Sequence, residues 1–236
     1  MRTKEFLSSH DIPFESIDIQ SHPHGLEQLH ALGAQSVPIV SYGKEWVFGQ
    51  MLKDVAAFLD VAFDPKPVLS PHELIDKLDM VMSAAQRYVA QIPEAKLDED
   101  MRDRKRPIRN LCYHIFRLEE ALMEVVEEGI HMTHAMLAPP IPPHIRATAD
   151  LVAYGCQVQQ RLRHWWAGFE DKDCAREIDT YYGLQPLHNV LERHTWHPAQ
   201  HVRELMLLLR DHGIEPDGPL CDADFAGLPL PEQVWN

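Results

Sequence analysis

The sequence has little of several things, and each shortage excludes a class of protein. No apolar run approaches the roughly 20 residues of a membrane-spanning helix, and residues 1–6 lack the apolar core of a signal peptide. Basic residues are scarce: 22 Lys and Arg against 36 Asp and Glu leave a formal net charge of −14. Because an acidic surface repels phosphate, we expect no nucleic-acid partner and no membrane association.

Cysteine is also scarce, with four residues in 236 and no CxxC pair. Without an export signal we expect these cysteines to be reduced thiols in the cytoplasm. The sequence has no glycine-rich phosphate loop and no serine in a GxSxG setting. What it has in excess is histidine: the 15 histidines are the composition's hint of metal or proton chemistry.

The chain divides near residues 64–71, where three prolines fall within seven residues and exclude a helix interior or a central strand. Before this point the segments are short and of mixed type; after it they are long and helical in period. We therefore expect an α+β protein of two domains. The expected boundaries are an α/β module over 1–63, a linker over 64–70, an all-α four-helix bundle over 71–215 and an irregular tail over 216–236.

The first part predicts short elements: helices over 3–9, 25–32 and 51–62, a strand over 14–19, and a hairpin that joins the β-prone run 37–40 to 45–48. In the second part, apolar residues recur in steps of three and four along four segments, so each segment predicts a helix with one buried face. The stripes run over residues 74–92, 111–125, 151–169 and 187–209, and Gly129 and Gly213 end the second and fourth helices. Four such helices bury their stripes most simply as a bundle.

The fourth helix carries histidine where its stripe calls for leucine. His194, His197 and His201 occupy inward positions over two turns, and His114 lies on the inward stripe of the second helix. Buried imidazole needs partners for its nitrogens, and histidines four residues apart can present both rings to one metal ion. Three histidines would leave a coordination position open for water or substrate, which is typical of a catalytic metal.

The spacing by itself says little, because 15 histidines in 236 residues give about one HxxxH pair by chance: 232 × (15/236)² ≈ 0.9. The alternative to a metal site therefore stays open: these residues are core histidines whose nitrogens form ordinary hydrogen bonds within the protein. For His194 three roles are open: a fourth ligand, a partner of a ligand, or an acid/base. We favour a non-ligand role and assign His194 as the candidate catalytic residue. Pro198 predicts a kink at this point.

Two segments resemble the DinB/YfiT-like superfamily: LCYHI at 111–115 and TWHPAQHVREL at 195–205. The resemblance covers about residues 70–213 and implies a four-helix bundle with a three-histidine metal site. Carried over residue by residue, it gives His114, His197 and His201 as metal ligands. The implied cofactor is a divalent metal, for which we favour zinc; nickel and iron stay open, since imidazole does not select sharply among them. Family members include isomerases and S-transferases that use low-molecular-weight thiols.

The first part resembles a glutaredoxin of the thioredoxin fold in its segments RTKEFL, PFESIDI, SVPIV and VFG. In that family the proline matching Pro38 is cis, and the backbone of the residue matching Val37 pairs with glutathione. The resemblance thus implies a glutathione site at Val37 and Pro38. The departure is that a glutaredoxin begins with a central strand and CxxC, and Met1 falls after both. Either a longer natural chain carries them, which we favour, or the protein has lost thiol redox chemistry.

Together these features predict a metal-dependent enzyme, a glutathione-dependent S-transferase or isomerase that takes a small-molecule thiol and an electrophilic substrate and forms a homodimer. Two alternatives stay open: a metal-stabilised binding or dimerisation module without catalysis, and a metal-dependent hydrolase. The basic run from Arg102 to Arg106 would attract a carboxylate-bearing substrate, or is a solvated loop.

Overall fold

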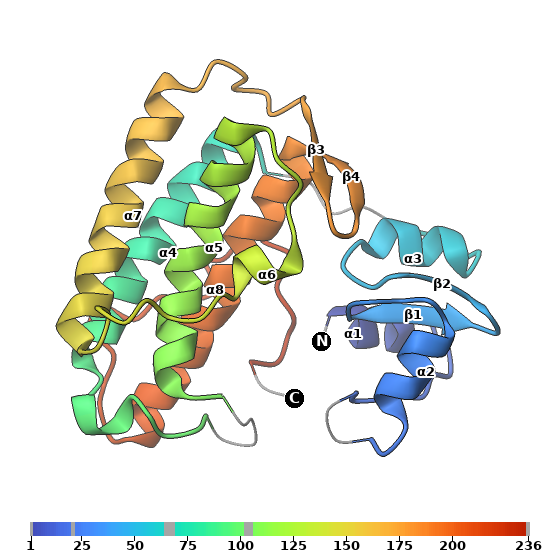
Figure 1. Ribbon diagram of the computed structural model, residues 1–236, viewed down its shortest axis with the longest axis horizontal. Coiled ribbons are helices and arrows are strands. Elements are labelled where there is room, and N and C mark those ends of the chain that lie inside the picture. Colours follow the sequence, from blue (N-terminus) through green and yellow to red (C-terminus); the bar gives the residue numbers. More distant parts are fainter. Residues whose placement is uncertain (1, 20–21, 64–68, 102–105, 235–236) are drawn as a thin grey trace. The chain divides into compact units, whose positions relative to one another are not determined.

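The computed structural model describes residues 2–19, 22–63, 69–101 and 106–234 (Figure 1). The described residues form two compact units, one before residue 64 and one after residue 68. Most of the expected linker, residues 64–68, lies outside the described residues. Among the residues described, no helix is both long and apolar enough to cross a membrane.

The first unit is built from three short helices and one hairpin. They are α1 (Arg2–Ser9), α2 (Gly25–Ala31), β1 (Ile39–Tyr42), β2 (Glu45–Phe48) and α3 (Leu52–Phe58). The two strands pair antiparallel, with Ile39 opposite Phe48, and Gly43 supplies the positive φ of 64° that the tight turn needs. Phe6, Leu7, Val55 and Ala56 form a small core. The three expected helices and the hairpin are thus present.

The expected strand over residues 14–19 is wrong. These residues have no regular secondary structure, and Phe14 and Ile17 are exposed. A strand exists only through backbone pairing, and in the described part of this unit β1 and β2 pair only with each other. The Val37–Pro38 peptide bond is cis, as the glutaredoxin resemblance implies. A two-stranded sheet does not establish a thioredoxin fold, and that assignment is not confirmed.

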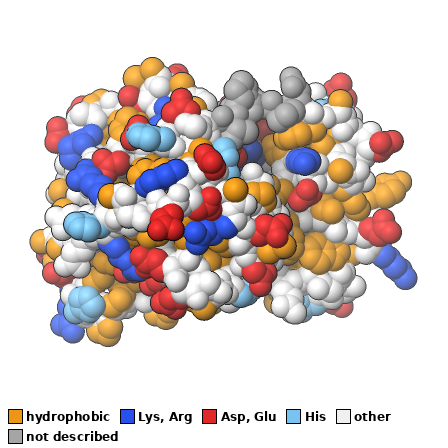
Figure 2. Space-filling model, turned by 90° about the horizontal axis from the view of Figure 1, so that it is seen from above, with side chains coloured by type: hydrophobic (Ala, Val, Ile, Leu, Met, Phe, Trp, Pro, Cys, Tyr) orange, Lys and Arg blue, Asp and Glu red, His pale blue; other side chains and the backbone are white. Residues whose placement is uncertain are grey.

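The second unit contains the predicted bundle of four long helices: α4 (Pro71–Gln91), α5 (Ile108–Glu128), α7 (Thr148–Gly168) and α8 (Leu187–Asp211). Helix α4 packs on α7 and α8, and α5 packs on the same two helices (Figure 1). The predicted stripes are the core: Leu74, Leu111, Leu151 and Leu205 are all fully buried. On the face shown in Figure 2, acidic side chains are interspersed with basic and hydrophobic ones.

Helix ends follow local chemistry. Ser70 caps α4 through its side chain, which accepts from the backbone of Glu73, while the Glu73 carboxylate accepts from the backbone of Ser70. Pro71 then occupies the first helical position, where its missing N–H costs nothing. Helix α5 ends at Gly129, whose φ of 64° is easy for a residue without a Cβ. Helix α8 continues through Pro198 from Leu187 to Asp211.

The sequence reasoning missed four elements between the long helices: a 3-10 turn (Glu94–Lys96), α6 (His134–Leu137), β3 (Glu177–Thr180) and β4 (Gly183–Pro186). After α8, residues 214–234 contain no helix or strand. This segment is held on α4 by side chains, because Lys77 Nζ donates to the Asp224 carbonyl at 2.8 Å and Tyr88 Oη to that of Gly218 at 3.0 Å. Irregular backbone is therefore anchored without pairing in a sheet.

Helix α7 crosses close to α5 at Gly155, which faces the Phe116 ring of α5. A Cβ at Gly155 would come within 2.6 Å of Cζ of the buried Phe116 ring. We expect Gly155→Ala to lower the free energy of unfolding by about 1–3 kcal/mol, because overpacking outweighs the gain in helix propensity. Far-UV circular dichroism in urea measures it. Gly168→Ala is the matched control, since a Cβ there meets nothing within 4 Å; equal behaviour of the two variants would contradict the close crossing.

Candidate metal centre

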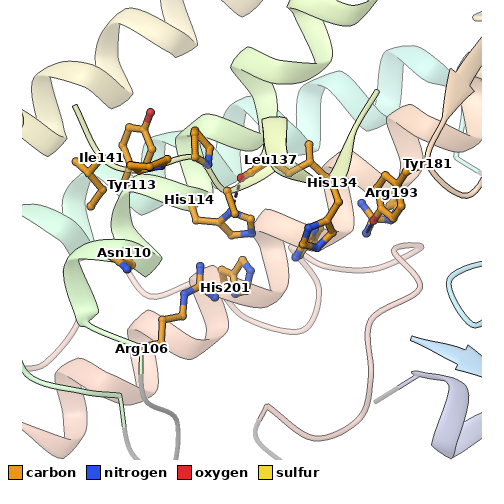
Figure 3. Close-up of a pocket in the computed structure, with 14 residues that line it drawn as sticks. Arg106, Asn110, Tyr113, His114, His134, Leu137, Ile141, Tyr181, Arg193 and His201 are labelled. Atoms are coloured by element: carbon orange, nitrogen blue, oxygen red, sulfur yellow. Dashed lines mark hydrogen bonds between the residues drawn. The ribbon is translucent and has the colours of Figure 1, made fainter. Parts of the chain in front are cut away.

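Two helices bring three histidines together (Figure 3). His197 and His201 lie one turn apart on α8, and His114 projects from α5, which packs against α8. The ring centroid of His114 is 5.3 Å from that of His197 and 5.2 Å from that of His201. The centroids of His197 and His201 are 4.8 Å apart. The structure thus brings the three predicted ligands to one point.

Each ring offers a nitrogen to this point, and the three nitrogens lie within 4.8 Å of one another. His114 Nδ1 donates to the Leu137 carbonyl at 2.8 Å, and His201 Nδ1 donates to Glu204 Oε2 at 2.9 Å. Both hydrogen bonds place the ring proton on Nδ1, so Nε2 carries a lone pair that can bind a metal. An outer hydrogen bond that orients the ring in this way is characteristic of metal-ligating histidine.

Two ring nitrogens of this cluster lack a partner in the described part of the chain. His201 Nε2 and His197 Nδ1 are both buried and form no hydrogen bond with any described residue. A buried polar atom without a partner is costly, so such atoms mark where something else binds. A divalent cation is the ligand that suits several converging imidazole lone pairs. The residues present therefore fit a metal ion.

The protonation states suit ligation as well. Burial, reinforced by the neighbouring His201, lowers the pKa of His114 to about 2. Burial also holds the pKa of His197 well below its usual range, and again the neighbouring His201 adds to the shift. Both rings are therefore neutral at pH 7, and a neutral imidazole is the form that binds a metal.

The three histidines open into a pocket of about 440 Å³, within the size range of small-molecule sites. Helix α6 and the prolines after it form one wall. That wall is tied to α5 twice, by His114 through the Leu137 carbonyl and by Arg117 Nε, which donates to the Met136 carbonyl at 2.9 Å. The lining residues are Arg106, Asn110, Tyr113, His114, His134, Leu137, Ala138, Pro139, Pro140, Ile141, Tyr181, Arg193, His197 and His201.

His194, the candidate acid/base, does not line this pocket. Its ring is fully buried, and its Nδ1 lies 3.9 Å from Oε1 of Glu119, which is also fully buried. His194 lies on the same side of α8 as His201 but two turns earlier, and there its ring packs beside Glu119 of α5. The structure thus places His194 in the core beside α5, away from the pocket.

Glu119 and His194 are both held in their uncharged forms. Burial raises the pKa of Glu119 well above its usual range. Burial, with a smaller contribution from Arg193, lowers the pKa of His194 to about 3. Neither carboxyl oxygen of Glu119 has a hydrogen-bond partner in the described part of the chain. A protonated carboxyl beside a neutral imidazole is the state that such burial favours.

The predicted glutathione residues lie in the other unit. The Pro38 carbonyl accepts from the backbone N–H of Gly49 at 2.8 Å, and Val37 is 39% exposed. A glutathione site there stays a prediction. Of the predicted basic run, residues 102–105 lie outside the described residues, and Arg106 lines the pocket.

Sequence reasoning missed Arg193, Tyr181 and His134 as pocket residues. For Arg193 the signal was available, since it precedes His197 by four residues and so shares its face of α8. Tyr181 and His134 belong to the hairpin and to α6, whose positions depend on tertiary packing. No periodicity in the sequence indicates them.

Comparison with known proteins gives a weak likeness to a solved structure. No family model matches this chain, and no curated protein matches it. Among solved structures, it is similar to YfiT from Bacillus subtilis, described as a probable metal-dependent hydrolase with an unusual four-helix bundle topology. The identity is 16%, the match covers 66% of this chain and 96% of that one, and the TM-score is 0.48. A likeness of this extent assigns no function to the chain.

Replacing Glu119 tests its protonation. In the folded protein this carboxyl stays protonated, whereas in the unfolded chain it ionises above about pH 4.5. Folding above that pH therefore takes up a proton, and the contribution of Glu119 to stability falls as the pH rises. We expect Glu119→Gln, which imitates the protonated carboxyl, to raise the free energy of unfolding at pH 8 by roughly 1–3 kcal/mol, and the gain to vanish near pH 4.5. Urea unfolding at both pH values measures it.

Glu127→Gln on the exposed face of α5 is the matched control and should show no such pH-dependent gain. A loss of stability at pH 8 in Glu119→Gln would instead indicate an ionised Glu119 paired with a charged His194.

Proposed function

We propose that the helical unit is a metal-dependent hydrolase of small molecules, with His114, His197 and His201 as the metal ligands. The observation that carries this is the convergence of three imidazole nitrogens within 4.8 Å at the wall of a pocket. Three protein ligands leave a coordination position for water or substrate, whereas structural zinc sites use four. The assignment agrees with the resemblance of residues 111–115 and 195–205 to the DinB/YfiT-like superfamily.

The chemistry that a bound divalent metal supplies is a water made nucleophilic at neutral pH. This chain's own residues supply the rest. The carbonyl of Leu137 and the carboxylate of Glu204 fix the orientation of two ligand rings and increase their basicity. Zinc fits this donor set, and nickel or iron fits it also, because three imidazoles do not discriminate among these ions.

A thiol-dependent S-transferase or isomerase is the second candidate. Its support is the glutaredoxin resemblance around Val37 and Pro38, together with Arg106 in the pocket lining, a cation suited to a glutathione carboxylate. In this version a metal held by the three histidines would lower the pKa of the glutathione thiol, and the resulting thiolate would form a C–S bond with the substrate as a leaving group departs. We place the hydrolase first because every residue it needs belongs to the second unit. A metal-stabilised binding or dimerisation module without catalysis is the third candidate.

Metal content tests the ligand assignment. We expect the purified protein to carry close to one divalent ion per chain, and His197→Ala or His201→Ala to lose most of it, since each removes one of three ligands. Elemental analysis by mass spectrometry after gel filtration measures the occupancy. His72→Ala, which removes an exposed histidine of α4, is the matched control and should retain the ion. Equal occupancy in all four proteins would refute the site.

Turnover tests the choice among the three functions. We expect the metal-loaded protein to hydrolyse small esters or amides without added thiol, and both a chelator and His201→Ala to abolish the activity. Turnover of an electrophile such as 1-chloro-2,4-dinitrobenzene that requires glutathione would select the transferase instead. A protein that holds its metal but catalyses neither reaction would support the binding module.

A further inference from the structure

Arg193 is a buried cation with an incomplete set of partners. The residue is 8% exposed, and its Nε and Nη1 are buried without a hydrogen-bond acceptor among the described residues. A guanidinium group carries a positive charge. A buried charge is tolerated when an opposite charge or a full set of acceptors compensates it. The described part of the chain supplies neither for these two nitrogens.

The pocket that Arg193 lines has no acidic residue among its fourteen described lining residues, but it includes a second arginine, Arg106. In the view of Figure 3, His114 and His201 lie between Arg106 on one side and Arg193 with Tyr181 on the other. In a chain of net charge −14, the only Lys, Arg, Asp or Glu side chains among these described lining residues are therefore the two arginines. A bound divalent metal would add to the positive charge, so a ligand that balances it must be anionic.

We propose that Arg193 forms a carboxylate-binding subsite beside the metal centre, so that the substrates of this site are small carboxylic acids held at one end by Arg193. The inference rests on the proposed function and specifies its substrate class. Arg193 precedes His197 by one helical turn and lines the same pocket, so an acid bound there would lie beside the three histidines. The guanidinium would position the substrate while the chemistry takes place at the metal.

The β3–β4 hairpin holds Arg193 in place before any ligand arrives. Arg193 Nη2 donates to the Tyr181 hydroxyl at 3.1 Å, and the guanidinium carbon lies 5.4 Å from the centroid of the Tyr182 ring. The hairpin is itself fixed, because the backbone N–H of Tyr181 donates to the Met132 carbonyl at 2.9 Å. A cation fixed in this way loses little conformational entropy when an anion binds.

The lining favours a carboxylate over a phosphate. Phosphate sites in proteins use several backbone N–H groups, hydroxyls or a lysine, often from a glycine-rich loop at a helix start. None of the described lining residues is glycine, serine, threonine or lysine, and the hydroxyls of Tyr113 and Tyr181 already pair with Tyr154 and Arg193. One guanidinium matches the charge and shape of one carboxylate.

Titration calorimetry on the full-length, metal-loaded protein tests the subsite with succinate as the probe. We expect succinate to bind the wild type and its uncharged counterpart succinamide to bind at least tenfold more weakly. Arg193→Met should weaken succinate at least tenfold. Arg193→Lys, which keeps the charge but not the planar donor set, should fall between the two. Arg210→Met removes the same charge from an exposed position on the same helix and should bind succinate as the wild type does.

Metal content, measured on the same samples, separates this inference from the proposed function. An unchanged ion content in Arg193→Met with weakened succinate supports the subsite. Retention of metal by His197→Ala would refute the metal centre. The succinate affinities of Arg193→Met and Arg210→Met would still decide whether the subsite exists. The inference is overturned if the wild type does not bind succinate, if Arg193→Met binds it equally well, or if inorganic phosphate binds more tightly. Should Arg193→Met fail to fold, unchanged binding in Arg193→Lys overturns it.

Discussion

The burial of imidazole inside a helical bundle is the constraint on which the rest depends. The core of a helical bundle normally consists of apolar side chains, but α8 places histidines in its interface with α5. Each ring brings two nitrogens that need partners. One partner comes from the protein for His114 and for His201, through the Leu137 carbonyl and Glu204. The nitrogens left over meet at one point, and that point is the candidate centre.

The parts of the fold that the sequence predicts are those governed by local rules. The stripe of α4, the cap at Ser70 and the glycine that ends α5 depend on residues within one or two turns, so they can be read without knowing the tertiary structure. The histidines at 114, 197 and 201 were found in the same way, because they occupy inward positions of two such stripes.

What the sequence does not predict depends on distant contacts. Residues 14–19 have the alternation of a strand, but a strand requires a neighbour, and in the described part of the first unit the only strands are β1 and β2. Helix α6 and the β3–β4 hairpin are too short to carry a periodic signal. The surroundings of His194 follow from Glu119 on another helix, which no spacing along α8 indicates. Pocket residues contributed by short elements were therefore missed.

His114 has two tasks at once. Its inner nitrogen faces the other two histidines, and its outer nitrogen anchors the wall of the pocket through Leu137. An imidazole ring is rigid, so any movement of one nitrogen is transmitted to the other. A metal ion that fixed the inner nitrogen of His114 would therefore also fix the donor that holds the Leu137 carbonyl, so the centre and this wall of the pocket share one rigid side chain.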